Sequence, residues 1–352
     1  MLYDSKLWIS DIDQVIGVLP ELDLLAGKSV LITGASGLIC SAIVDVLFRY
    51  NDSHNNKIQI FAAGRTLDKM RCRFGNMTGR GDFRYVPYNA ASADNKLNFH
   101  ADFIIHGASN AFPSAIVNEP VETMLSNFMG LKELLDYAKK EGSERVLYIS
   151  SSEVYGKIDD FAPYNEKQYG FIDLLESRNS YSVGKRAAET LCVSYACEYG
   201  VESVIVRPGH IYGPTAGSCD NRVSSAWAYS VAHGDDIVMK SDGSQVRSYC
   251  HCLDCASAIL KVLLCGKNSQ AYNISNPQSI ISIKQMAEIL AQYAGVNLRI
   301  EAPSELEKKG FNPMNNSSLD SKRLQELGWQ GCFDAKTGFE HTVEILKKTL
   351  SA

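Results

Sequence analysis

The chain has 352 residues, of which 45% are hydrophobic and 21% are charged, and its formal net charge is −5. This is the balance of a soluble globular protein, and the acidic charge argues against a nucleic-acid-binding protein, which needs a basic face. No run of about 18 apolar residues is present to span a membrane, so we expect neither nucleic acid nor a membrane as a partner.

Residues 1–27 predict an N-terminal extension of one or two short amphipathic helices that end near Gly27. The opening MLYDSKLWISDIDQ lacks the basic and then apolar layout of a signal peptide, so we expect a cytoplasmic protein. In that compartment the ten scattered cysteines are expected to be reduced thiols.

Apolar runs alternate with helical segments between residues 28 and 214. The predicted strands are SVLITG, KIQIFAAG, FRYVPY, DFIIHGAS, RVLYISSS and SVIVRPG, and helices are predicted after the first strand to Tyr50, over 121–140 and over 180–199. Continuous apolar strands separated by helices are typical of a parallel sheet covered on both faces. We therefore predict an α/β fold with a doubly wound parallel sheet of the Rossmann type, whose ligands bind beyond the carboxyl ends of the strands.

The alternation becomes less regular after Pro214, where helices are predicted near 226–233 and over 283–294. We expect residues 215–352 to form mainly a smaller substrate-binding lobe, with the segment 254–265 returning to the sheet. The cluster CHCLDC, residues 250–255, contains metal-binding residue types. Because no second ligand pair follows at the spacing that zinc requires, we predict that it packs in the core and that the chain has no metal site.

A glycine turn follows the first predicted strand. In SVLITGASGLIC, Gly34 and Gly37 lie between a strand and a helix, where glycine permits a tight turn and a pyrophosphate can approach backbone N–H groups. The third glycine position is occupied by Cys40, a small residue that still allows close helix–strand packing. This context predicts that residues 28–214 form an NAD(P)-binding domain.

The second predicted strand ends in a cation. An acidic residue there would accept hydrogen bonds from the adenosine ribose, whereas this chain has Arg65, followed by Lys69, Arg71 and Arg73. A guanidinium can bind a 2′-phosphate through two parallel hydrogen bonds. We therefore expect NADP(H) to be preferred, with NAD(H) as the alternative; Arg65 stacked on adenine or lying in solvent is the other interpretation.

Two further motifs predict proton-transfer chemistry. Tyr181 and Lys185 are four residues apart on a predicted helix and share a face, where an ammonium would lower the pKa of the phenol. The stretch SSSEVYG, residues 150–156, follows the strand RVLYI, so its hydroxyls are expected at the carboxyl edge of the sheet. A serine there can hold the oxygen atom that Tyr181 protonates.

The order of the motifs along the chain is informative. TGASGLIC, HGAS, SSSEVYG, YSVGK, RPGHIYGP and VRSYCHCLD follow one another as in the extended short-chain dehydrogenase/reductases, and the chain resembles their nucleotide-sugar epimerase/dehydratase family. The closing LDSKRLQELGW, residues 319–329, is similar to the C-terminal segment of that family. The resemblance therefore spans about residues 28–350 and implies a nucleotide-sugar substrate.

The resemblance also implies roles for individual residues. Asn127, Arg207 and Asp254 match positions that support the fold, and Arg247 matches an arginine that binds the nucleotide pyrophosphate. The implied catalytic residues are Ser151, Tyr181 and Lys185, with Glu153 beside them. The implied cofactor contacts are Gly34, Ser36, Gly37, Leu38, Ile39, Arg65, His106, Ala108, Tyr181 and Lys185. The implied substrate contacts are Ser152, Glu153, His210 and Arg247.

The family contains several reactions at C4 of a sugar. The 4,6-dehydratases carry Asp-Glu where this chain has Ser152 and Glu153, which disfavours dehydration, whereas UDP-glucuronate decarboxylases often have Ser-Glu and 4-epimerases usually lack this Glu. Enzymes that regenerate their own NAD gain nothing from selecting the phosphorylated form. Arg65 therefore favours a net reductase of a nucleotide-linked 4-keto-6-deoxyhexose, such as dTDP-4-dehydro-6-deoxyglucose.

The alternatives left open are an NAD-dependent 4-epimerase, a UDP-glucuronate decarboxylase and, in another class, a non-catalytic dinucleotide-binding protein. The resemblance further implies a homodimer formed through paired helices and a role in deoxysugar synthesis for surface polysaccharide.

Overall fold

The computed structural model describes residues 1–350 except 93, 110, 112, 159–161 and 303–314. Its main element is a seven-stranded parallel sheet in the order β10-β6-β5-β4-β1-β2-β3. The strands are β1 (Ser29–Thr33), β2 (Gln59–Gly64), β3 (Phe83–Pro87), β4 (Phe103–His106), β5 (Arg145–Ile149), β6 (Ser203–Pro208) and β10 (Ala271–Ile274). Strand order reverses at β1, so the predicted doubly wound α/β fold is confirmed.

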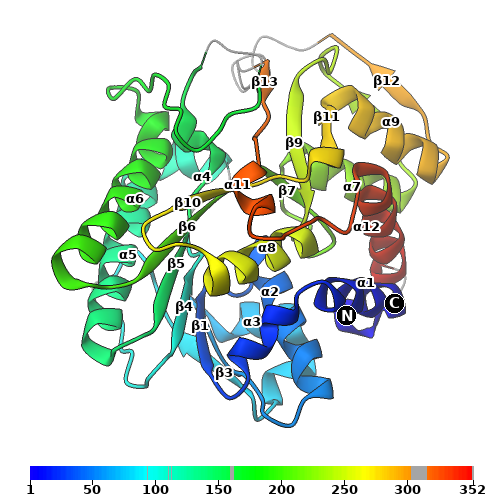
Figure 1. Cartoon of the computed structure of the whole chain (residues 1–352). Helices are drawn as coiled ribbons and strands as arrows, with labels where there is room; N and C mark the ends of the chain where they lie inside the picture. Colours follow the sequence, from blue (N-terminus) through cyan, green and yellow to red (C-terminus); the bar gives the residue numbers. More distant parts are fainter. Residues whose placement is uncertain (93, 110, 112, 159–161, 303–314, 351–352) are drawn as a thin grey trace.

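Helices cover both faces of this sheet (Figure 1). Side chains alternate along β1: Val30 and Ile32 belong to one apolar cluster with helices α2 (Leu38–Ser53) and α8 (Cys252–Cys265), and Leu31 belongs to another on the opposite face. That second cluster includes side chains of α5 (Pro120–Glu141) and α6 (Ser180–Tyr199). Because both faces are buried, the strands carry the continuous apolar runs seen in the sequence. Short helices α3 (Leu67–Phe74), η3 (Gly75–Gly79) and α4 (Pro113–Asn118) complete this region.

The N-terminal extension folds as helices η1 (Leu2–Asp4), α1 (Lys6–Gly17) and η2 (Pro20–Leu25) against α2 and α8. The Trp8 indole is fully buried, and its N–H donates to the Asp45 carboxylate at 2.9 Å. A second contact joins the two ends of the chain, since His341 Nδ1 lies 3.0 Å from an Asp11 carboxylate oxygen. The predicted helices of the first 27 residues are therefore present and anchored.

A smaller group of elements lies beyond β6 and has its own apolar core. Its strands are β7 (His210–Tyr212), β8 (Ile237–Met239), β9 (Val246–His251), β11 (Ile280–Ser282), β12 (Leu298–Ile300) and β13 (Asn316–Ser317). Its helices are α7 (Val223–His233), η6 (Pro277–Ser279), α9 (Ile283–Ala294), α11 (Lys322–Gln325) and α12 (Ala335–Leu350). In contrast, α8 and β10 pack with the large sheet, although they come late in the chain.

All ten cysteines are free thiols. Cys250, Cys252 and Cys255 of the CHCLDC cluster are fully buried in the core formed with α2 and α8. Burial is the main cause that raises the pKa of each of these thiols. Within the described ranges, no group of three His, Cys, Asp or Glu side chains is placed to hold a metal ion, and no helix has the length and apolarity to cross a bilayer.

Candidate active site

The predicted site residues gather along one edge of the sheet. The Gly34 turn follows β1, His106 ends β4, and Ser151 follows β5, while His210 begins β7 just after β6. These strands are parallel, so their carboxyl ends meet at one edge. Sequence segments more than 100 residues apart are thereby brought to a common cleft edge, as the topology of the sheet requires.

Gly34 occupies a position that only glycine fits without strain. Its φ is +69°, and a Cβ built on it would lie 2.9 Å from the Gly107 carbonyl oxygen and 3.0 Å from Ala108 Cα. The positive φ disfavours any other residue, and the close approach of two backbones leaves no room for a side chain. This is the backbone cradle expected beneath a pyrophosphate.

Helix α2 begins at this cradle with Gly37 as its N-cap, and no side chain in the described part of the chain caps its first N–H groups. The half-buried Leu38 and Ile39 form its first turn, so their N–H groups are free to meet an anion. Ser36 precedes them and is half-buried. The residues present therefore fit a dinucleotide pyrophosphate.

Cys40, at the third glycine position, is buried against Gly107. A Cβ on Gly107 would lie within 2.3 Å of the Cys40 sulfur, so the larger residue on the helix is matched by a glycine on the facing strand end. The expected close packing of helix and strand is retained through this exchange of positions.

Arg65 follows β2 and its side chain is exposed. Among the described residues, no carboxylate or carbonyl is paired with its guanidinium. A hollow of about 440 Å³ lies beside it. The lining residues are Arg65, Pro87, Tyr88, Asn89, Asp94, Asn95 and Lys96. Lys96 adds a second exposed cation that sequence reasoning missed, because it comes from a loop 31 positions further along the chain.

The other cations near Arg65 in sequence do not gather around this hollow. Arg73 is turned onto α2, where it donates to the Asp45 carboxylate at 2.6 Å and to the Ser41 hydroxyl at 3.0 Å. Arg71 pairs with Asp68 on its own helix at 4.0 Å. Arg73 therefore adds no attraction for a phosphate at this hollow, because its charge is used inside the fold.

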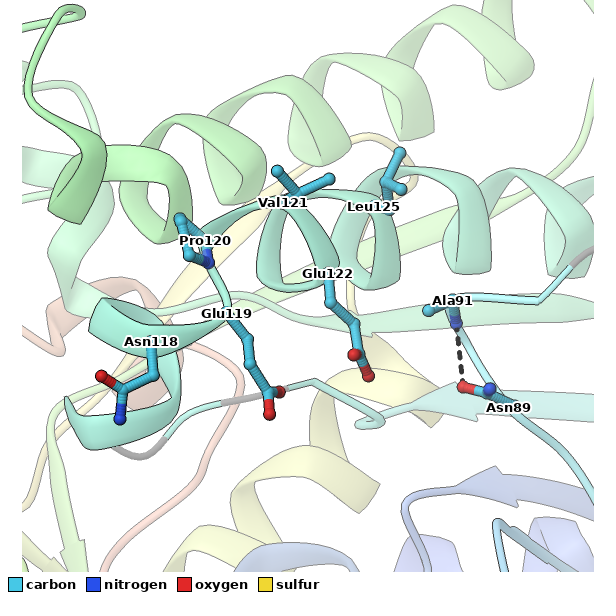
Figure 2. Close-up of a pocket in the computed structure, with 8 residues that line it drawn as sticks. All are labelled: Asn89, Ala91, Asn118, Glu119, Pro120, Val121, Glu122 and Leu125. Carbon is cyan, nitrogen blue, oxygen red and sulfur yellow. Dashed lines mark hydrogen bonds between the residues drawn. The ribbon is translucent and has the colours of Figure 1, made fainter.

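A second hollow, of about 530 Å³, adjoins the first, since Asn89 lines both. Figure 2 shows it between the start of α5 and the loop of Asn89 and Ala91, with the Glu119 and Glu122 side chains projecting from the helix side. The lining residues are Asn89, Ala91, Asn118, Glu119, Pro120, Val121, Glu122 and Leu125. Its lining has two carboxylates and no cation, which makes it a poor place for a phosphate, whereas the hollow beside Arg65 has two cations and one carboxylate, Asp94.

His106 lies at the end of β4 with its ring turned into the interior. Its Nδ1 is 2.7 Å from the Thr33 hydroxyl, which also accepts the N–H groups of Gly107 and Ala108 at 3.2 Å. Burial, and after it the Lys185 ammonium, lower the pKa of His106 to about 3, so the ring is neutral. The side chain thus fixes the strand end, and Ala108 after it is half-buried.

Tyr181 lies near the start of α6 and is buried beside Ser151. Burial and then the Glu153 carboxylate raise the pKa of Tyr181 to about 12, and a hydrogen bond with the Ser151 side chain acts in the opposite direction. The expected lowering by Lys185 is not found, because the Lys185 ammonium lies over the rings and not at the hydroxyl, 5.6 Å from the Tyr181 ring centre. In this geometry Tyr181 is a protonated phenol.

Lys185 lies one turn further along α6 and is buried. Its ammonium donates to the Ile149 carbonyl oxygen at 2.7 Å and lies 4.7 Å from the Tyr148 ring centre. Burial is the largest cause that lowers the pKa of Lys185, to about 7, against the opposing charge of Glu189. This places a titrating ammonium at the end of β5, where the resemblance assigns it to the nicotinamide ribose.

Glu153 is hydrogen-bonded to two neighbouring side chains. Arg178 holds it through two hydrogen bonds, 2.7 Å and 3.0 Å long, and the Ser182 hydroxyl donates a third at 3.0 Å. The pairing was not foreseen from sequence, since Arg178 belongs to no motif and comes from the short helix η5 (Ser177–Asn179). Ser152 is the first residue of helix η4 (Ser152–Tyr155) and is half-buried next to it.

His210 and Arg247 lie together on the substrate side. Burial, then the charges of Arg247 and Arg222, lower the pKa of His210 to about 3, so its ring is neutral. Arg247 is only 4% exposed, and among the described residues its one hydrogen bond is to the neighbouring Val246 carbonyl, at 2.9 Å. A buried guanidinium without a carboxylate partner fits an anion such as a pyrophosphate.

The residues matched to structural positions are placed accordingly. Asn127 is fully buried and donates to the Thr123 carbonyl, and Arg207 is 1% exposed and paired with Glu189 at 2.6 Å. Asp254 is fully buried and accepts the N–H of Cys332 at 2.7 Å.

Comparison with known proteins identifies the family. The model of the NAD dependent epimerase/dehydratase family matches residues 30–275. The chain is 28% identical over 324 residues to UDP-glucuronic acid decarboxylase 1 of Xenopus tropicalis, covering 92% of this chain and 73% of the relative. It is 28% identical over 302 residues to UDP-glucuronic acid decarboxylase 6 of Arabidopsis thaliana, covering 86% and 83%.

Solved structures share the fold. A UDP-glucose 4-epimerase from Thermotoga maritima, in complex with UDP-glucose, superposes with a TM-score of 0.75 at 20% identity, covering 92% of this chain and 99% of that one. A dTDP-glucose 4,6-dehydratase from Streptomyces venezuelae, with NAD bound, gives 0.76 at 22% identity, covering 92% and 98%. The predicted resemblance and the prediction of an enzyme are confirmed: the chain belongs to the NAD-dependent epimerase/dehydratase family of extended short-chain dehydrogenase/reductases.

Proposed function

We propose that this protein is an NAD(P)H-dependent reductase of a nucleotide-linked 4-keto-6-deoxyhexose, for example dTDP-4-dehydro-6-deoxyglucose. The observation that carries the proposal is Tyr181, buried beside Ser151 at the carboxyl edge of the sheet, where burial raises the pKa of the phenol to about 12. Reduction of a ketone needs a proton donor at the carbonyl oxygen, which is the form of Tyr181 that its surroundings favour.

Each residue of the site has a role in this reaction. The nicotinamide cofactor would supply a hydride to C4. Ser151 orients the carbonyl oxygen, and Tyr181 donates its proton to that oxygen. Lys185 at the end of β5 would return a proton to Tyr181 through a hydroxyl or water between them, because its ammonium does not reach the Tyr181 oxygen directly. Arg247 and the neutral His210 hold the pyrophosphate and neighbouring groups of the nucleotide.

Arg65 supports net reduction with NADPH. Its exposed guanidinium has no partner within the described ranges, and the exposed Lys96 also lines the hollow. Two cations against the single carboxylate of Asp94 at the expected ribose end favour a 2′-phosphate. Several solved relatives are described in complex with NAD, so NAD(H) stays the alternative cofactor.

A second candidate is decarboxylation of UDP-glucuronate with internal recycling of NAD. It is favoured by the Ser152-Glu153 pair and by the relatives named as UDP-glucuronic acid decarboxylases. In this reaction Tyr181 would act first as a base and take the C4 hydroxyl proton. Its raised pKa leaves little of the phenolate that this first step needs at neutral pH.

One experiment separates the two candidates. The purified protein is incubated with dTDP-4-dehydro-6-deoxyglucose and NADPH, and separately with UDP-glucuronate without added cofactor. Oxidation of NADPH with the keto sugar alone supports the reductase, whereas CO₂ release from UDP-glucuronate rejects it in favour of the decarboxylase. Tyr181→Phe is the matched control, since it removes the donor and keeps the ring, and it should abolish either activity.

The biological setting rests on the same proposal. We predict a cytoplasmic homodimer that acts on a nucleotide sugar in deoxysugar synthesis for surface polysaccharide such as lipopolysaccharide O-antigen.

A further inference from the structure

The Arg178–Glu153 ion pair joins two segments that carry the reacting groups. Glu153 follows Ser151 by two residues, and its own N–H donates to the Ser151 hydroxyl at 3.1 Å. Arg178 precedes Tyr181 by three residues on the chain that enters α6. The ion pair therefore ties the turn that holds Ser151 to the helix that holds Tyr181.

Both side chains are partly exposed and not buried in the protein. The Arg178 side chain is 39% exposed and the Glu153 side chain 34%. The hydrogen bonds of the Glu153 carboxylate are made within the protein. Each of its two oxygens accepts an N–H group of Arg178, and the Ser182 hydroxyl donates a third hydrogen bond. A planar guanidinium gripping a carboxylate through two parallel bonds fixes orientation as well as distance.

We propose that Arg178 is a positioning residue: by holding Glu153 it fixes Ser151 against Tyr181 and balances the negative charge beside the Tyr181 hydroxyl. Glu153 in this view acts through its charge and its hold on the turn, and it is not a direct proton-transfer group. The inference rests on the proposed function for its effect on turnover, but the charge balance can be measured without any substrate.

The charged groups around Tyr181 come from several elements. Glu153 on η4 raises the Tyr181 pKa, while Arg178 on η5 and Arg222, just before α7, lower it. Arg222 is itself held by Asp220, which accepts its Nε–H at 2.9 Å. On the helix of Tyr181 itself, Lys185 lies over the ring, and Tyr148 of β5 is also near enough to be affected.

The test is a direct titration of the Tyr181 phenol in the full chain. Tyrosine labelled with ¹³C at Cζ is followed by NMR against pH, and the Tyr181 signal is assigned by its loss in Tyr181→Phe. Glu153→Gln should lower the midpoint and Arg178→Gln should raise it, each by about one pH unit, because each removes a single neighbouring charge. The double variant should return close to the wild-type midpoint.

The matched control is Arg186→Gln. Arg186 also ties α6 to the same turn, donating to the Val154 carbonyl at 2.6 Å, but it makes no ion pair with Glu153. This variant should lower the melting temperature and leave the Tyr181 midpoint in place. A midpoint that stays fixed in Arg178→Gln, or that moves in the same direction as in Glu153→Gln, would overturn the proposal.

Turnover is measured separately so that the two proposals fail differently. Arg178→Gln should lower kcat about tenfold or more with little change in KM, and Arg178→Lys, which keeps the charge, should restore the phenol midpoint but only part of kcat. If the protein reduces no keto sugar while the midpoints move as expected, the proposed function fails and the role of Arg178 stands. If turnover is found and the midpoints do not move, the proposed function stands and the role of Arg178 is rejected.

Discussion

At the residue scale, Arg65 offers the most direct test of cofactor choice. Replacing it with Asp should weaken NADPH at least about tenfold more than NADH, because a carboxylate repels the 2′-phosphate and accepts hydrogen bonds from a free ribose. Lys96→Glu should act in the same direction and more weakly. The measurement is the dissociation constant of each reduced nucleotide by fluorescence titration.

Lys69→Glu is the matched control for Arg65, because it reverses an exposed cation on the following helix that does not line the hollow. It should change both affinities little. Equal weakening of NADPH and NADH in Arg65→Asp would mean that Arg65 stacks on adenine and does not contact a phosphate.

Gly34 provides a second residue-scale prediction. Gly34→Ala forces a side chain into a backbone conformation with φ +69° and within 3.0 Å of Gly107 and Ala108. We expect a loss of about 1–3 kcal/mol of stability and a much larger loss of dinucleotide affinity, because the turn must move away from the strand end. Thermal unfolding and nucleotide titration check the two effects.

The control for Gly34 is Gly17→Ala at the end of α1, where an added Cβ meets nothing within 4 Å. Its melting temperature should equal that of the wild type or exceed it slightly. Unchanged nucleotide affinity in Gly34→Ala would show that the cradle does not hold the pyrophosphate.

The site residues that could be predicted lie in short local motifs. Ser151, Tyr181 and Lys185 lie in short stretches whose chemistry depends on the strand or helix that bears them. The Arg178–Glu153 pair could not be predicted, because it joins residues 25 positions apart through a loop without periodicity. Arg73 is the opposite case. It lies close to Arg65 in sequence, but on α3 its side chain is directed to the Asp45 carboxylate.

At the element scale, Asp254 joins α8 to the segment before α12. Its carboxylate accepts the N–H groups of Cys332 and Phe333, at 2.7 Å and 3.2 Å, and the Asn276 amide at 3.3 Å. Burial outweighs these donors and raises the pKa of Asp254 from 3.8 to about 7. The link is therefore sensitive to pH.

The sign of that dependence follows from proton binding. Between about pH 4 and 7 the folded state binds more protons at Asp254 than the unfolded state, so its contribution to stability is complete below about pH 4 and is lost as the pH rises through 7. Asp254→Asn should remove this component of the pH dependence. The variant should also cost about 1–3 kcal/mol, because an amide leaves part of the donor set unpaired.

Urea unfolding of wild type and Asp254→Asn between pH 5 and 8 measures both effects. Parallel curves across this range would contradict a raised pKa. Asp334→Asn is the matched control, since Asp334 is a neighbouring carboxylate that caps α12 by accepting the Thr337 N–H at 2.7 Å from an exposed position. It should keep the wild-type slope.

The elements themselves were predictable to different degrees. Helices α6 and α9 begin and end where the sequence predicts them, and the six predicted strands of the large sheet are found within a few residues. The short strands β7, β8, β11 and β12 were not foreseen. Three residues cannot display a period. Strands β7 and β11 form because β9 offers an edge to pair with, and β8 and β12 pair with each other.

At the scale of the whole molecule, segments from the C-terminal half of the chain pack against segments from the N-terminal half. Strand β10 adds to the sheet beside β6, α8 packs against α2, and the extension of α1 lies on both α2 and α8. Thr215, just after the last motif of the sheet region, donates to the Leu38 carbonyl at the start of α2 at 2.8 Å. Folding of the cofactor cradle is thereby coupled to the lobe that would hold the substrate.

Helix α5 carries a row of exposed apolar side chains. Val121, Leu125 and Met129 recur every four residues and are 71%, 43% and 45% exposed, so they form an apolar stripe on a helix whose other side is buried. Val193 of the adjacent α6 is 44% exposed. Apolar side chains that recur on paired helices indicate a helical interface, and the expected occupant is α5 and α6 of a second copy.

We therefore expect the protein to sediment as a dimer at micromolar concentration. Met129→Glu should shift it to a monomer with an unchanged circular dichroism spectrum, because the charge would be buried twice in a symmetric interface. Val223→Glu is the matched control, since Val223 is equally exposed, at 46%, but lies on α7. It should leave the sedimentation coefficient unchanged. A wild-type protein that sediments as a monomer would show that α5 and α6 do not pair between copies. A dimer that persists in Met129→Glu would show that the interface lies on another face of the molecule.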